Sequence, residues 1–148
     1  MATYTQILYH IVFSTKDREK TLLENHREQL FHYIWGILKS KQCVLYQING
    51  TADHLHIATH IHPTLSLASL VKDLKVATSV WIKSDNIFPY FNSWQEGYGG
   101  FTYSYKEKQV LINYIKNQKE HHKTKSFREE FIELLTVHGI PFDERFLK

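Results

Sequence analysis

The chain has 148 residues, of which 43% are hydrophobic, and its formal net charge is +3. This length suits one domain with a single core and is too short for two ordinary domains, while the small excess of Lys and Arg permits a polyanionic partner without requiring one. The single cysteine, Cys43, excludes an intrachain disulfide. We expect a cytoplasmic protein with no membrane anchor, because no secretory leader opens the chain and no run reaches about eighteen apolar residues.

The first half of the chain predicts three strands and one helix. A β-branched and aromatic run at residues 7–13 is typical of a central strand. Apolar residues at helical spacing then predict a helix over residues 24–40 that covers one face of a sheet. Residues 44–48 and 53–62 predict two further strands, and the short connection at 49–52 makes them an antiparallel hairpin.

The third of these strands carries two histidines on one face. His54 and His56 are two positions apart, so their side chains point the same way and lie about 6.5–7 Å apart along the strand. Leu55 and Ile57 point to the other face. Two imidazoles on one rigid face can hold a divalent cation if a third ligand comes from elsewhere. A histidine pair that merely faces solvent would give the same local pattern.

Residues 65–83 predict a second helix with an apolar stripe on one side and a basic stripe on the other. Lys72, Lys75 and Lys83 recur at helical spacing, which suits contact with the phosphate oxygens of a nucleic acid. Exposed lysines on an ordinary solvated helix face would look the same. These three residues are therefore candidate DNA contacts.

A glycine-rich segment precedes the fourth predicted strand. Gly97, Gly99 and Gly100 indicate a tight turn before a strand that ends near residue 104. The resulting βαββαβ order predicts an α+β fold with a ferredoxin-like (RRM-like) antiparallel sheet. We expect the first two helices to cover the face of Leu55 and Ile57, which leaves the histidine face for a ligand, a partner chain or a later helix.

Two additional helices are predicted after the sheet. The first spans about residues 106–121 and carries Tyr114 and Gln118 four positions apart, so their side chains lie on adjacent turns. Tyr114 shares its face with apolar residues, a pattern that a packed core tyrosine would also give. A capping-box pattern at residues 126–129 opens a last helix over about 126–138. Together with a sheet and crossover helices at about 6–104, these helices complete one expected domain over 1–148.

Four motifs in this order resemble the HUH-type single-tyrosine transposases of the insertion-sequence 200/605 kind, whose relatives include the REP-associated tyrosine transposases. The resemblance covers about residues 6–146. Its motifs are Tyr-His-Ile-Val-Phe-Ser-Thr at 9–15, Asp-His-Leu-His-Ile at 53–57, Trp-Gln-Glu-Gly-Tyr-Gly at 94–99 and Tyr-Ile-Lys-Asn-Gln at 114–118.

The resemblance implies a single-stranded DNA transposase. In this family the paired histidines, here His54 and His56, and the residue one turn after the tyrosine, here Gln118, bind Mg²⁺ or Mn²⁺. Tyr114 is then the nucleophile, and it cleaves and rejoins strands at hairpin-marked ends through a 5′-phosphotyrosine intermediate. The resemblance also implies a homodimer whose tyrosine helices complete the partner's sites.

The remaining histidines match no ligand position of this family. We expect them to be strand, surface or phosphate-proximal residues; they are His10, His60, His62, His121 and His122. No general base is evident in the sequence.

Two other functions are compatible with the residues taken alone. A non-catalytic module that binds single-stranded nucleic acid could use exposed aromatic rings and the three lysines. A small metal-dependent nucleotide hydrolase would use water as its nucleophile. The joint presence of His54, His56, Tyr114 and Gln118 favours the transposase, since a binding module needs none of this set.

Overall fold

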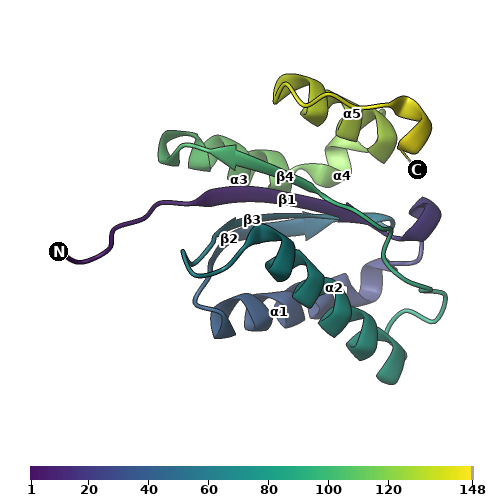
Figure 1. Ribbon diagram of the computed structural model, residues 1–148. Helices are drawn as coiled ribbons and strands as arrows, with labels where there is room; N and C mark the ends of the chain where they lie inside the picture. Colours follow the sequence, from purple (N-terminus) through teal and green to yellow (C-terminus); the bar gives the residue numbers. More distant parts are fainter. Residues whose placement is uncertain (148) are drawn as a thin grey trace.

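The computed structural model describes residues 1–147, in which a four-stranded antiparallel sheet lies between two layers of helices (Figure 1). The order of strands across the sheet is β2-β3-β1-β4. The strands are β1 (Leu8–Ser14), β2 (Val44–Gly50), β3 (His54–His60) and β4 (Gly99–Tyr103). The predicted ferredoxin-like βαββαβ arrangement is confirmed.

Eight helical segments surround the sheet in the described residues. One layer contains α1 (Glu24–Ser40) and α2 (Leu67–Ser84), and the other contains α3 (Lys108–Lys116), α4 (Gln118–His121) and α5 (Phe127–Val137) (Figure 1). Three short 3-10 turns are η1 (Lys16–Arg18), η2 (Tyr105–Glu107) and η3 (Glu144–Phe146). None of the helices among residues 1–147 has the length and apolar character that a membrane crossing requires.

The face of the sheet that carries Leu55 and Ile57 packs against α1 and α2, as expected. Both residues are fully buried in a cluster with Leu30 and Ile34 of α1 and Leu74 of α2. Burying each such side chain contributes about 1.5–3 kcal/mol to stability. This layer fixes the register of β3, because a shift of one residue would turn its histidines into the core.

The opposite face of the sheet is covered by the C-terminal helices. Leu111 and Ile115 of α3 pack on Leu8 and Ala58 of the central strands. A second cluster joins α5 to β1 and β4 and consists of Val12, Phe101, Phe127, Leu134 and Leu135. The histidine face is therefore enclosed by the chain's own helices instead of facing solvent.

Two of the three glycines predicted to form a turn lie within β4. Gly97 has the positive φ of a turn, +89°, but Gly99 and Gly100 pair with β1. A Cβ atom on Gly99 would lie 2.6 Å from the Phe131 ring of α5, and one on Gly100 would lie 2.6 Å from Leu67 of α2. The prediction of a turn at these two positions was wrong, because the glycines allow helices to approach both faces of the strand.

The helix predicted over 106–121 is interrupted at Asn117. Its backbone there has φ −92° and ψ 21°, so α3 ends at Lys116 and α4 begins at Gln118. The amide of Asn49 on β2 donates hydrogen bonds to the carbonyls of Ile115 and Lys116, at 3.0 and 3.1 Å. These bonds satisfy carbonyls that a continuous helix would otherwise use, and they anchor the end of α3 to the sheet.

Candidate active site

His54 lies at the start of β3 and is fully buried beneath α5. Its Nδ1 atom lies 2.6 Å from a carboxylate oxygen of Asp53 and 3.0 Å from the hydroxyl of Thr51. Burial alone would lower the pKa of His54, but the hydrogen bonds that its ring donates to the carboxylates of Asp53 and Glu130 outweigh burial and raise it. Asp53 therefore fixes the orientation of the ring, leaving Nε2 directed toward the centre of the site.

His56 is also fully buried, and both of its ring nitrogens are engaged. Its Nδ1 lies 2.7 Å from Nε2 of His10, and its Nε2 lies 3.0 Å from Oε1 of Glu130. Burial lowers the pKa of His56 to about 4 even though the Glu130 carboxylate acts in the opposite direction. His56 is thus a neutral imidazole at pH 7, the form that binds metals. His10, expected to be a strand or surface residue, orients this ring.

Glu130 of α5 is the residue on which the site converges. It is only 2% exposed, and its Oε1 lies 3.0 Å from Nε2 of His56, 3.0 Å from Nε2 of His122 and 3.4 Å from Nε2 of His54. Burial would raise the pKa of this carboxyl group, but hydrogen bonds from the three imidazoles hold it well below its usual range. Glu130 is therefore an ionised carboxylate inside the protein.

The donor atoms of these residues fit a divalent cation. One ligand atom from each of His54, His56, His122 and Glu130 lies within 4.8 Å of all the others. Ligands bound at about 2.0–2.2 Å around one ion lie about 3–4 Å apart, so small side-chain movements would bring the four together. Three imidazoles and one carboxylate form a common ligand set for divalent transition metals.

Tyr114 and Gln118 reach the same point from α3 and α4. The phenolic hydroxyl of Tyr114 donates a hydrogen bond to Oε2 of Glu130, and Nε2 of Gln118 donates to the same oxygen at 3.1 Å. Oε1 of Gln118 lies 3.2 Å from Nε2 of both His54 and His122. Burial, followed by the negative charge of Glu130, raises the pKa of Tyr114. The four residues singled out in the sequence thus lie together.

Two residues of the site were not predicted. His122 was expected to be a surface or phosphate-proximal residue, but its Nδ1 lies 2.7 Å from the Lys125 carbonyl and its Nε2 faces the site. His122 lies one helical turn after Gln118, so the two side chains share a face and both reach the cluster. Glu130 could have been detected as an acid on the apolar stripe of its helix, at helical spacing from Phe127 and Leu134.

The lysines of α2 do not join this site. Lys72, Lys75 and Lys83 belong to the helix layer on the other side of the sheet from His54 (Figure 1). Lys75 donates hydrogen bonds to the carbonyls of Gln95 and Gly97, at 2.8 and 2.6 Å, and so holds the loop before β4.

Comparison with known proteins decides the family. Residues 3–118 match the model of a family described as "Transposase IS200 like", which is more than half of the chain. The chain belongs to the IS200-like transposase family. It is therefore an enzyme of the DNA transposase class. The matched residues end at Gln118, so the family model includes His54, His56 and Tyr114 but does not reach His122 or Glu130.

Curated relatives and solved structures agree with this assignment. The transposases for insertion sequence element IS200 of Salmonella typhimurium and Salmonella typhi are each 29% identical over 120 residues, which is 78% of this chain and 78% of theirs. A Deinococcus radiodurans protein assigned as a transposase is 23% identical, with a TM-score of 0.63 over 80% of this chain and 95% of its own. A REP-associated tyrosine transposase bound to a REP hairpin is 14% identical, with a TM-score of 0.62 over 82% and 72%. The two structures share the fold of this transposase.

Proposed function

We propose that this transposase cleaves and rejoins single-stranded DNA through a covalent bond to Tyr114, assisted by a divalent cation at the histidine cluster. One observation carries the proposal: the Tyr114 hydroxyl and the imidazoles of His54 and His56 meet at the two oxygens of Glu130. A nucleophile and a metal-binding group are thereby placed side by side, as phosphoryl transfer requires.

The reaction would proceed by attack of the Tyr114 oxygen on phosphorus. A bond forms between the phenolic oxygen and phosphorus, the bond from phosphorus to the 3′-oxygen breaks, and the products are a 5′-phosphotyrosine and a free 3′-hydroxyl. The phenol, whose pKa is raised, must give up a proton as this bond forms, and the departing 3′-oxygen must take one up. Oε2 of Glu130 accepts the phenol's hydrogen bond and would receive the first proton, and water would supply the second. Because the phosphodiester energy stays in the covalent adduct, a 3′-hydroxyl can reverse the step without ATP.

His54, His56, His122 and Glu130 would hold the cation, and Gln118 is a further candidate ligand through Oε1. When bound, Mg²⁺ or Mn²⁺ supplies positive charge to the scissile phosphate and orients it. Three imidazoles suit Mn²⁺ better than Mg²⁺, because Mg²⁺ prefers oxygen ligands and retains its waters. We therefore propose Mn²⁺ as the better-bound of the two.

The DNA would contain a hairpin, since the REP-associated relative of similar fold is bound to one. Lys72 and Lys83 are exposed on α2 and remain proposed contacts for phosphates at a distance from the scissile bond. Lys75 would act chiefly through the loop that it holds.

The geometry supports an active site built within one chain. Tyr114 lies next to the histidines of its own chain, with His56 and Tyr114 ring centroids 5.9 Å apart. The homodimer implied by the resemblance remains a prediction, and an exchange of tyrosine helices is not needed to bring these groups together.

The test is a gel assay with labelled single-stranded DNA cut from the flanks of the gene, hairpins included, in the presence of Mn²⁺ or Mg²⁺. We expect label that migrates with the denatured protein and is lost with EDTA or with Tyr114→Phe. Tyr105→Phe is the matched control, because Tyr105 is exposed on η2 and should keep full adduct formation. DNA binding without any adduct would favour the non-catalytic binding module.

A further inference from the structure

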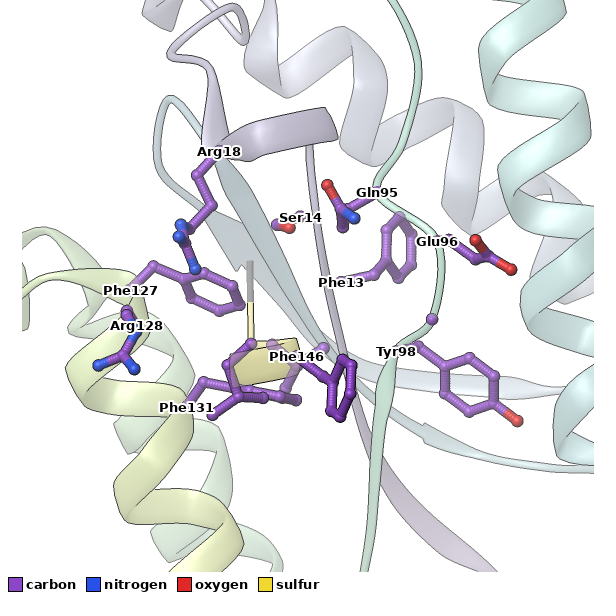
Figure 2. Close-up of a pocket in the computed structure, with 13 residues that line it drawn as sticks. Phe13, Ser14, Arg18, Gln95, Glu96, Tyr98, Phe127, Arg128, Phe131 and Phe146 are labelled. Carbon is purple, nitrogen blue, oxygen red and sulfur yellow. The ribbon is translucent and has the colours of Figure 1, made fainter. Parts of the chain in front are cut away.

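A pocket of about 230 Å³ opens beside the candidate active site. It lies between the end of β1, the loop before β4, α5 and the C-terminal turn η3 (Figure 2). Aromatic and cationic side chains dominate its lining, among them Phe13, Arg18, Tyr98, Phe127, Arg128 and Phe146. None of the residues that line the pocket has been assigned above to metal binding or catalysis.

One ring separates this pocket from the histidine cluster. Phe127 forms a wall of the pocket and stacks on His54, with ring centroids 4.3 Å apart and planes inclined by 23°. A molecule in the pocket would therefore lie immediately next to the proposed metal and tyrosine centre. A segment of the DNA substrate adjoining the scissile phosphate would be in the right place to enter it.

The pocket carries two arginines available to an anion. The guanidinium group of Arg18 makes no hydrogen bond or ion pair within residues 1–147, and Figure 2 shows it reaching toward Phe127. Arg128 has only a long ion pair with Glu144, at 3.8 Å between two largely exposed side chains. The carboxylate of Glu96 points away from the ring of Phe127 in Figure 2, so it does not neutralise this side of the pocket.

The walls are held in place before any ligand binds. The backbone N–H of Asp17, next to Arg18, donates to the side-chain oxygen of Gln95 at 2.8 Å. The N–H of Gln95 in turn donates to the Ser14 carbonyl at 2.8 Å. These bonds attach η1, which carries Arg18, to the loop that carries Tyr98. The pocket walls therefore need little further ordering when a ligand binds.

We propose that this pocket binds one unpaired nucleotide of single-stranded DNA next to the cleavage position. The base stacks among the rings of Phe127, Phe146 and Tyr98, and Arg18 and Arg128 contact the adjoining phosphates. Its volume of about 230 Å³ lies below the range of about 300–1,000 Å³ of ordinary small-molecule sites, which suits a group as small as one base. The proposal rests on the proposed action on single-stranded DNA and adds the residues that hold the strand.

The experiment uses the full chain with Tyr114→Phe, so that the DNA remains uncut, and a fluorescein-labelled single strand of ten thymidines as the probe. Fluorescence anisotropy over a range of salt concentrations would compare Arg18→Gln, Arg128→Gln and Phe146→Ala. Each arginine change should weaken binding severalfold and reduce the salt slope by about one, and Phe146→Ala should weaken it about fivefold or more. Lys39→Gln is the matched control, because Lys39 is exposed on α1, in the helix layer on the other side of the sheet, and lies outside the pocket.

A second readout locates the base directly. The same strand with one central 5-iodouracil, irradiated on the protein, should crosslink to peptides that contain Phe127, Phe146 or Tyr98. Crosslinks confined to α2, or an equal loss of affinity in Lys39→Gln, would overturn the proposal. The pocket proposal and the catalytic proposal can fail separately. If DNA forms an adduct with Tyr114 but the pocket variants bind DNA normally, only the pocket proposal is wrong. If the pocket variants lose affinity but no adduct forms, only the catalytic proposal is wrong.

Discussion

Tyr114 donates its phenolic hydrogen bond to Glu130, a carboxylate sixteen residues further along the chain. The other oxygen of this carboxylate accepts from three imidazoles, those of the buried His54 and His56 and of the partly buried His122. A single side chain of α5 thus connects the proposed nucleophile with the proposed metal ligands. A substitution of Glu130 should therefore break the link between the Tyr114 hydroxyl and the proposed metal ligands.

Glu130→Gln should weaken Mn²⁺ binding by about tenfold or more, because the amide removes the only carboxylate among the four clustered donors. Isothermal titration calorimetry of Mn²⁺ into EDTA-treated, dialysed protein would measure the change. Glu133→Gln is the matched control, since Glu133 lies one turn further along α5 and pairs with Lys125 at the surface. Equal Mn²⁺ affinity in Glu130→Gln and wild type would exclude Glu130 as a ligand.

Metal-free protein should lose stability as the pH falls from 7 to 5. The pKa of His56 is about 4 in the folded chain and about 6.5 when unfolded, so the unfolded state binds more protons in this window. His56 alone then contributes a loss of about 2 kcal/mol, and His10, whose pKa is also lowered by burial, acts in the same direction. The raised pKa of His54 opposes them, because its contribution is present at low pH and is lost as the pH rises.

Urea unfolding in EDTA at the two pH values would measure this difference in free energy. A free energy of unfolding that is higher at pH 5 than at pH 7 would contradict the assignment of His56 and His10 as buried neutral groups.

Gly99→Ala should destabilise the protein by about 1–3 kcal/mol, since the new methyl group would meet the Phe131 ring at 2.6 Å and force α5 away from β4. Gly36→Ala is a contrasting variant on α1, where a Cβ atom has no neighbour within 4 Å. It should stabilise by about 0.5–1 kcal/mol, because alanine loses less backbone entropy than glycine in a helix. Urea midpoints of both variants would show opposite shifts, and a neutral Gly99→Ala would disprove the close approach of α5.

The fold was largely predictable because the local patterns agree with one another. The helix predicted over residues 24–40 is α1, and Leu55 and Ile57 face it as the alternation of β3 requires. The site was only partly predictable. His54, His56, Tyr114 and Gln118 could be proposed from a family resemblance, whereas the position of Tyr114 on an apolar helix face, taken alone, is typical of a packed core residue.

Glu130 and His122 depend on tertiary structure. Nothing in the sequence near Glu130 shows that α5 folds back over the histidine face. His122 shares a helical face with Gln118, but its place in the cluster depends on where α4 and α5 pack. The role of Gly99 also depends on tertiary structure, because it is the ring of Phe131 on α5 that packs against this glycine.

Mixed dimers should show no recovery of cleavage when a His54→Ala/His56→Ala chain is combined with a Tyr114→Phe chain. Each chain of the pair lacks one half of the proposed site, whose tyrosine and histidines lie together in one chain. Adduct formation on co-expressed, doubly tagged heterodimers would measure this. Restored cleavage would instead demonstrate that the tyrosine of one chain serves the histidines of the other.

The most direct test of the central claim is mass-spectrometric mapping of the covalent adduct formed with flanking single-stranded DNA and Mn²⁺. We predict one modified residue, Tyr114, carrying the DNA through its 5′-phosphate, with no adduct in Tyr114→Phe. An adduct on another residue, or one that persists in Tyr114→Phe, would contradict the assignment of Tyr114 as the nucleophile of this transposase.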